Sequence, residues 1–372
     1  MIIGGTVLAT CRRDPSIYEP SPPTSSPPPD SAYNPTPIQL DYPQNALLPP
    51  PILPPDNPLT KEGIALGRML FYDPILSGDS TQSCASCHLQ SFAFTDSARF
   101  SRGITGAIGT RNAMQIINAA WQHSFFWDGR SPSLEAQALE PVENPIEMAA
   151  RWPDVIARLR RHPTYPTLFY KAFGTQTITP KLVTKAIAQF ERTLISFNSR
   201  YDQYKRGEIE LTPLERLGEQ LFFSEPLIDP LGTKITAGGD CFHCHSGALF
   251  TDNLFHNNAL DSAHTIYDFP DPGLGAITQR PEDYGKFKTP TLRNIELTAP
   301  YMHDGRFATL EEVIREHYNK GGYWSPTVDP LMKFVNKGGL RLNDMEIQAL
   351  VAFLKTLTDT TFLHNPAYSN PF

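Results

Sequence analysis

The chain has 372 residues, of which 40% are hydrophobic and 19% are charged, so it is long enough for two globular domains of ordinary size. The formal net charge of -7 gives no reason to expect nucleic-acid backbones as partners. No apolar run in the body approaches the roughly 20 residues needed to cross a bilayer, so no transmembrane helix is predicted there.

Residues 1–11 read as the remnant of an export signal of the bacterial lipoprotein type, because a short apolar run precedes Cys11. The favoured interpretation makes Cys11 a lipid anchor, and the alternative is an ordinary export signal with an incidental cysteine. Residues 12–56 are predicted to be a Pro-rich linker, since sixteen of the 36 prolines lie between Pro15 and Pro58. The expected location is the periplasm or the extracytoplasmic membrane surface of a bacterium.

Helical spacing of apolar residues begins at Leu59, and the same plan occurs twice along the chain. The segments 59–74 and 211–226 both contain Leu-Gly-x-x-Leu-Phe, and both precede a Cys-x-x-Cys-His motif. After each Cys-x-x-Cys-His motif the chain also contains an Arg-Asn pair followed by Asp-Gly-Arg, at 111–112 and 128–130 in the first half and at 293–294 and 304–306 in the second. Further helices are predicted over 153–161, 180–197, 309–318 and 343–357, and no segment shows sustained strand alternation.

Four of the five cysteines form two pairs that are each followed directly by histidine. This spacing suits covalent attachment of haem c, in which both thiols form thioethers and the adjacent imidazole binds the iron. A shared zinc site is disfavoured because the motifs lie 157 residues apart. The haem-binding residues are therefore predicted to be Cys84, Cys87, His88, Cys241, Cys244 and His245.

These features predict a mainly α fold with two cytochrome c-like helical domains, over residues 57–200 and 201–372, whose long ordered loops wrap two covalently attached haems. The loop after His88 offers no histidine before His123 and no methionine before Met114. The second half does offer candidates for a sixth iron ligand: Met302, His303, His317, Tyr318 and Met332. We therefore expect a reactive haem in the first domain and an electron-transfer haem in the second.

The chain from about residue 57 to 357 resembles the bacterial dihaem cytochrome c peroxidase superfamily. The resemblance is carried by both CxxCH motifs, AFTD, FFWDGR and TAPYMHDGRF, while EHYNKGG is most similar to the MauG-like branch. It implies a peroxide-dependent oxidoreductase. Peroxidases that need reductive activation carry a histidine in the first loop, and SRGITGAIG has none, as in the MauG-like branch. We therefore expect the first iron to be open to peroxide in the fully oxidised protein.

The resemblance also implies individual site residues. Trp127 matches a tryptophan that bridges the haems, although core packing would also explain it. Glu147 matches the residue that acts as general acid and base, and Gln137 matches the second polar residue of the peroxide pocket. Without the resemblance, Glu147 would be interpreted as a surface carboxylate. A calcium site between the haems matches Asn112, Thr298 and Pro300, although Asn112 alone could be a helix cap.

Alignment with the family leaves two candidates for the sixth ligand of the second iron, and Tyr318 is preferred with His317 as the alternative. The predicted oxidant is hydrogen peroxide, and the predicted reductant is a small cytochrome c, a cupredoxin or a protein substrate. Two other functions are weighed against this one: a non-catalytic dihaem electron carrier and a sensor of oxygen or peroxide.

Overall fold

The computed structural model describes residues 33–44, 48–229 and 231–372. The predicted export signal with Cys11, and the linker as far as residue 32, lie outside these residues. Within the described ranges no helix is long and apolar enough to cross a membrane.

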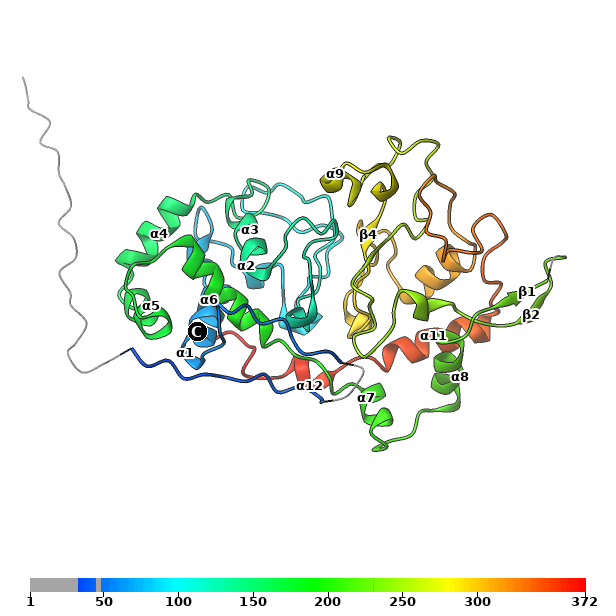
Figure 1. Cartoon of the computed structure of the whole chain (residues 1–372), viewed down its shortest axis with the longest axis horizontal. Helices are drawn as coiled ribbons and strands as arrows, with labels where there is room; N and C mark the ends of the chain where they lie inside the picture. Colours follow the sequence, from blue (N-terminus) through cyan, green and yellow to red (C-terminus); the bar gives the residue numbers. More distant parts are fainter. Residues whose placement is uncertain (1–32, 45–47, 230) are drawn as a thin grey trace, which may run out of the picture. The chain divides into compact units, whose positions relative to one another are not determined.

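Two pairs of crossed helices form the framework, one in each half of the chain (Figure 1). In the first half α1 (Lys61–Tyr72) packs against α6 (Pro180–Arg192), and in the second half α8 (Pro213–Phe222) packs against α11 (Asp344–Lys355). The threonine before α1 and the threonine before α8 each cap their helix, with Thr60 accepting from the Gly63 amide and Thr212 from the Glu215 amide.

The repeated Leu-Gly-x-x-Leu-Phe motif has a packing explanation in this framework. A Cβ on Gly67 of α1 would overlap the carbonyl oxygen of Ala186 in α6. A Cβ on Gly218 of α8 would overlap the carbonyl oxygen of Ala349 in α11 in the same way. Glycine is therefore required in both motifs because the partner helix's backbone occupies the space that a side chain needs.

Shorter elements and long loops fill the rest of the described chain. The other helices are α2 (Leu134–Gln137), α3 (Glu140–Glu143), α4 (Trp152–Arg161), α5 (Tyr165–Phe173), α7 (Arg200–Lys205), α9 (Gly275–Thr278), α10 (Leu310–Glu312), α12 (Thr360–Leu363) and the π-helical turn η8 (Val313–Tyr318). Two antiparallel pairs of short strands are formed by β1 (Leu227–Ile228) with β2 (Lys234–Thr236), and by β3 (Phe255–His256) with β4 (Phe287–Lys288). The helix-rich character agrees with the predicted class.

Two helix predictions differ from the structure, and one long helix was missed. The helix predicted over 180–197 ends at Arg192, because the following residues pair with another loop: Leu194 O accepts from the Asn118 amide at 2.8 Å. The helix predicted over 309–318 changes at Val313 from α to π geometry. Helix α5 was not predicted, although its residues Tyr165 and Phe169 are fully buried.

Each half has its own principal apolar core. The first is built around α1, α4, α5 and α6, and the second around α8 and α11. After Leu357 the chain leaves the second core and returns to the first, where Phe362 is buried. The chain end lies beside α1 (Figure 1), and Arg68 Nε of that helix donates to Ser369 O at 2.7 Å.

The described part of the predicted linker is extended but packs along the body. The Ile38 amide donates to Leu59 O at 3.0 Å, and Trp121 Nε1 donates to Pro49 O at 2.7 Å. Leu48 is buried in a small cluster with Trp121. Proline-rich composition did not show that aromatic and aliphatic residues within this segment would find partners on the body.

Candidate haem-binding and peroxide site

The first Cys-x-x-Cys-His motif folds as a 3₁₀ turn, η2 (Cys84–Ser86), directly before His88. The Nδ1 atom of His88 lies 2.8 Å from the carbonyl oxygen of Phe94, and burial lowers the pKa of the imidazole. A neutral ring that donates from Nδ1 has its Nε2 lone pair available for a metal. Burial also raises the pKa of the Cys84 thiol.

The second motif repeats this geometry on the turn η5 (Cys241–His243). His245 Nδ1 lies 3.2 Å from the carbonyl oxygen of Phe250, and burial lowers the pKa of His245 to about 4. The two carbonyl acceptors are in similar settings, since Phe94 and Phe250 both have left-handed backbones, with φ of 60° and 52°. The sequence repeat is therefore also a repeat of ligand orientation.

A largely apolar cavity of about 230 Å³ surrounds the second motif. It is lined by Cys241, Cys244 and His245, and by apolar side chains from α10, η8 and α11. None of the four described cysteines forms a disulfide. Thiols, an adjacent imidazole and an apolar enclosure fit a covalently bound haem.

Trp127 lies between this cavity and a smaller pocket, and it lines both. Its Nε1 donates to Asn112 O at 2.9 Å, and its carbonyl oxygen accepts from the Lys288 amide at 2.8 Å. The smaller pocket also includes Met114, whose backbone lies beside the His88 ring. The indole thus forms part of the wall of both pockets.

The two candidates for the sixth ligand of the second iron occupy different surroundings. Tyr318 lines the cavity, whereas His317 does not. The His317 ring is instead engaged with the backbone, with Nε2 2.9 Å from Asn258 O. The Tyr318 hydroxyl accepts from Asn258 Nδ2 at 3.5 Å, and burial raises its pKa to about 12. Both residues close the π-helical turn η8, a kind of turn often found at functional sites.

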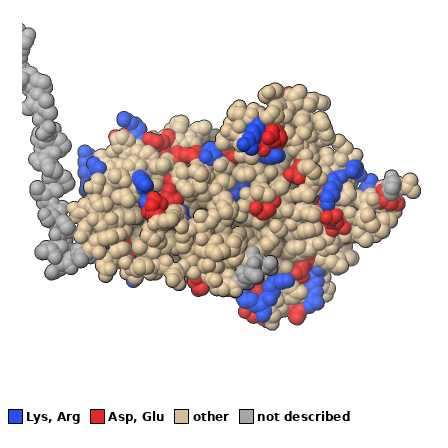
Figure 2. Space-filling model, in the orientation of Figure 1, with Lys and Arg blue, Asp and Glu red and all other residues tan. Residues whose placement is uncertain are grey.

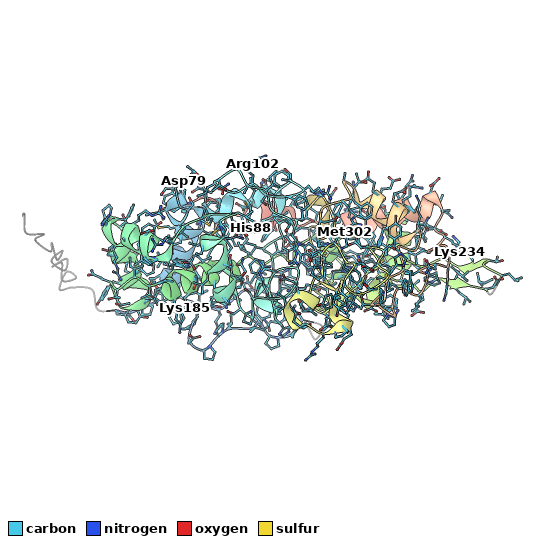
Figure 3. The ribbon with its side chains drawn as sticks, turned by 90° about the horizontal axis from the view of Figure 1, so that it is seen from above. Asp79, His88, Arg102, Lys185, Lys234 and Met302 are labelled. Carbon is cyan, nitrogen blue, oxygen red and sulfur yellow. The ribbon has the colours of Figure 1, made fainter. Side chains whose placement is uncertain are left out.

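Other candidates named from the sequence also line the cavity, namely Met302, His303 and Met332. The His303 ring stacks on Phe287 with centroids 3.6 Å apart. Met302 Sδ accepts from the same Asn258 amide as Tyr318, also at 3.5 Å. Figure 3 marks Met302 in the second half of the chain, away from His88 in the first.

Glu147 follows α3 in a loop beside the first motif. Burial raises the pKa of its carboxyl, while a 2.7 Å hydrogen bond from Asn144 Nδ2 acts in the opposite direction. The carboxyl is near enough to both cysteines of the motif to raise the pKa values of their thiols, although burial is the larger cause. Gln137 is the last residue of α2, which contacts α3.

The smaller pocket has a volume of about 70 Å³ and includes all three residues predicted for calcium, Asn112, Thr298 and Pro300. Two further amides, Gln115 and Asn253, lie in its wall. Gln115 Nε2 donates to Thr291 O at 2.9 Å and Asn253 Nδ2 to Trp121 O at 3.3 Å, whereas their side-chain oxygens are buried without a hydrogen-bond partner. Amide oxygens of this kind fit a hard cation such as Ca²⁺.

Two other groups near the second motif were not identified from the sequence. His256 is held between Asp252 at 2.8 Å and Asp329 at 2.5 Å, and hydrogen bonding to Asp252 is the main reason that its pKa is raised to about 11. Lys288 is buried in the walls of both pockets. Neither residue belongs to a recognisable sequence motif. The sequence also gives no reason to expect that Lys288, rather than Lys286 two residues earlier, is buried.

Comparison with known proteins gives a consistent result. A family model described as di-haem cytochrome c peroxidase matches residues 61–210. The chain is 37% identical over 311 residues to the methylamine utilization protein MauG of Methylorubrum extorquens, covering 81% of this chain and 79% of that protein. It is 34% identical over 295 residues to the cytochrome c551 peroxidase of Nitrosomonas europaea, covering 79% of each.

Among solved structures, a MauG-like protein associated with microbial copper homeostasis is 38% identical and superimposes with a TM-score of 0.80, over 90% of this chain and 99% of that one. The repeated haem-binding turns, the pocket between them and these similarities agree. The chain belongs to the di-haem cytochrome c peroxidase family, whose members carry two haems c and use hydrogen peroxide as oxidant.

Proposed function

We propose that this protein reduces hydrogen peroxide at a haem held by Cys84, Cys87 and His88, and that a haem held by Cys241, Cys244 and His245 exchanges electrons with it. When bound, the first haem supplies an iron that coordinates peroxide and the second supplies a separate redox centre. The position of Glu147 carries the proposal, because a half-buried carboxyl with a raised pKa lies beside the first haem-binding motif.

Glu147 acts as general base and then general acid. Its carboxylate would accept a proton from one peroxide oxygen and return it to the other, which would leave as water, while the haem would supply the two electrons that cleavage of the O–O bond requires. Burial suits this exchange, since it raises the pKa of Glu147 and so makes the carboxylate a stronger proton acceptor than an exposed one. Gln137 is proposed to orient the peroxide by hydrogen bonding, and the loop at Ile104, whose amide donates to Glu147 O at 2.9 Å, fixes the backbone of the glutamate.

The test uses the fully oxidised protein with both haems attached, mixed with stoichiometric peroxide in a stopped-flow spectrometer. Glu147→Gln is expected to slow the spectral change by about 10²- to 10⁴-fold. Glu143→Gln, which neutralises an exposed carboxylate on α3, is the matched control and should react like the parent. A parent protein that is inert to peroxide would instead support the electron-carrier function.

We assign Trp127 and Tyr318 to the second redox centre. Trp127 connects the two pockets and is proposed as the route for electrons between the haems. Tyr318 is proposed as the sixth ligand of the second iron, in preference to His317, because only the tyrosine lines the cavity. Tyrosinate ligation favours oxidised iron, which suits a centre that stores oxidising equivalents.

The smaller pocket is proposed to bind one calcium ion through Asn112, Thr298 and Pro300. The unpartnered oxygens of Gln115 and Asn253 add two donors of the right chemical type. The ion would link the two halves of the chain, which already meet where the Asn112 amide donates to His303 O at 2.7 Å.

The reductant is proposed to be a small cytochrome c or cupredoxin, or a protein whose side chains are oxidised. The name of the Nitrosomonas relative contains cytochrome c551, which supports the first class of donor. The similarity to MauG and to the MauG-like protein supports the second. The periplasm is the proposed location, with a lipid anchor at Cys11 as its proposed attachment to the membrane.

A further inference from the structure

Lys288 is a buried cation without a carboxylate partner among the described residues. Charged side chains of both signs are interspersed on the surface in Figure 2, whereas Lys288 is only 3% exposed. Two buried arginines, Arg192 and Arg293, are each paired with a carboxylate, on Glu135 and Asp202. The Lys288 ammonium instead donates to two neutral oxygens, Gln122 Oε1 and Ser124 O, both at 2.6 Å.

An unpaired buried ammonium is costly, because desolvation is not offset by an opposite charge. Burial accordingly lowers the pKa of Lys288 to about 7. The residues lining the smaller pocket include Lys288 but neither aspartate nor glutamate. A calcium ion in the same pocket would add a second positive charge, so even more negative charge would be needed nearby to balance the two. Two aspartates, Asp240 and Asp329, do line the larger cavity, but their ion pairs are with Lys333 and His256 and neither is paired with Lys288.

The cofactor itself carries suitable anions, since each haem has two propionate carboxylates. Lys288 lines the cavity of the second haem as well as the smaller pocket. Its backbone is fixed on β4, where it pairs with Phe255 and donates to Trp127 O at 2.8 Å. We propose that Lys288 is the cationic partner of a propionate of the haem held by His245, and that its charge raises the reduction potential of that haem.

The expected sign follows from charge balance. Reduction adds one electron to the haem, so a nearby positive charge favours the reduced state and its removal favours the oxidised state. The side chain acts through the propionate rather than on the iron, which makes Lys288 a positioning residue. Lys286 offers a matched control, because it carries the same charge two residues away but pairs with Asp283 at 3.2 Å and lines neither pocket.

The experiment is a spectroelectrochemical titration of the full protein with both haems attached. Lys288→Met should shift the midpoint potential of the second haem to lower values, whereas Lys288→Arg should stay near the parent. Lys286→Met should shift it much less than Lys288→Met. Lys288→Gln keeps an N–H donor for Ser124 O and serves as the neutral variant if the methionine fails to fold; it should show the same negative shift.

Two results would overturn the inference: an effect of neutralising Lys288 no larger than that of Lys286→Met, or an equal shift in Lys288→Arg and the neutral variants. Resonance Raman bands of the propionates, expected to change in the neutral variants alone, give a second readout. Neither measurement uses peroxide, so a negative result for Lys288 would leave the proposed catalytic role of Glu147 untouched.

Discussion

Gly67 of α1 lies directly against the carbonyl oxygen of Ala186 in α6, with no room for a methyl group between them. Because the obstruction is backbone, neither helix can relieve it by moving a side chain. Gly67→Ala is therefore expected to destabilise the protein by about 3 kcal/mol or more, at the upper end of the usual cost of overpacking. Gly218→Ala should behave alike at the crossing of α8 and α11.

Chemical denaturation followed by circular dichroism measures these effects. Gly109→Ala is the control, because the nearest atom to its added Cβ is Ser101 O at 3.7 Å and its backbone is not left-handed. Equal stability of Gly67→Ala and Gly109→Ala would show that the two helices separate more easily than their packing indicates.

The pH dependence of the peroxide reaction should respond to Asn144. Its Nδ2 donates to Glu147 at 2.7 Å, which lowers the glutamate pKa, while its Oδ1 accepts from the Ile146 amide at 3.0 Å. Asn144→Asp keeps the acceptor, removes the donor and adds a negative charge, so the pKa of Glu147 should rise. Since the carboxylate is the form that takes the first proton, the acidic limb of the rate profile should move to higher pH. If the acidic limb of the rate profile did not move in Asn144→Asp, the group that titrates there would not be Glu147.

The ligand of the second haem can be tested with neighbouring residues of one turn. Tyr318→Phe removes the hydroxyl from the cavity and should change the absorption and electron paramagnetic resonance spectra of that haem. His317→Gln keeps a donor for Asn258 O, and it should leave both spectra as they are. The reverse pattern would assign the ligand to His317.

Cation binding should depend on the amides that were not identified from the sequence. Asn253→Leu and Gln115→Leu each remove a buried, unpartnered oxygen from the smaller pocket. Each substitution is expected to weaken calcium binding measured by calorimetry after removal of the ion with a chelator. Asn365→Leu, far along the chain and outside the pocket, is the control. Unaltered affinity in both pocket variants would limit the binding site to Asn112, Thr298 and Pro300.

Much of the site could be predicted because its chemistry depends on local spacing. Two cysteines and a histidine within five residues determine the attachment turn, and the structure repeats that turn with the same carbonyl partner for the imidazole. The helix pairs were also predictable in outline, since their apolar faces follow helical periodicity.

The features that the sequence left undetermined depend on long-range contacts. Lys286 and Lys288 flank the same phenylalanine, yet only the second is buried, because β4 pairs with β3 and turns Lys288 toward Gln122. The π-helical turn η8, which contains both His317 and Tyr318, has no characteristic residue pattern that would identify it in a sequence. The side-chain oxygens of Gln115 and Asn253 can be recognised as candidate cation ligands only in the fold, where two loops distant in the sequence line one pocket.

The return of the chain end to α1 bears on how the protein is assembled. Phe362 completes the first core, and Tyr72 Oη of α1 donates to Tyr368 O at 2.7 Å, so α1 is covered by residues that follow the second repeat in the sequence. A fragment cut after residue 200 would lack this closing segment and leave apolar surface of the first core open to water. The two halves are thus interlocked, because the segment that follows the second repeat completes the core of the first.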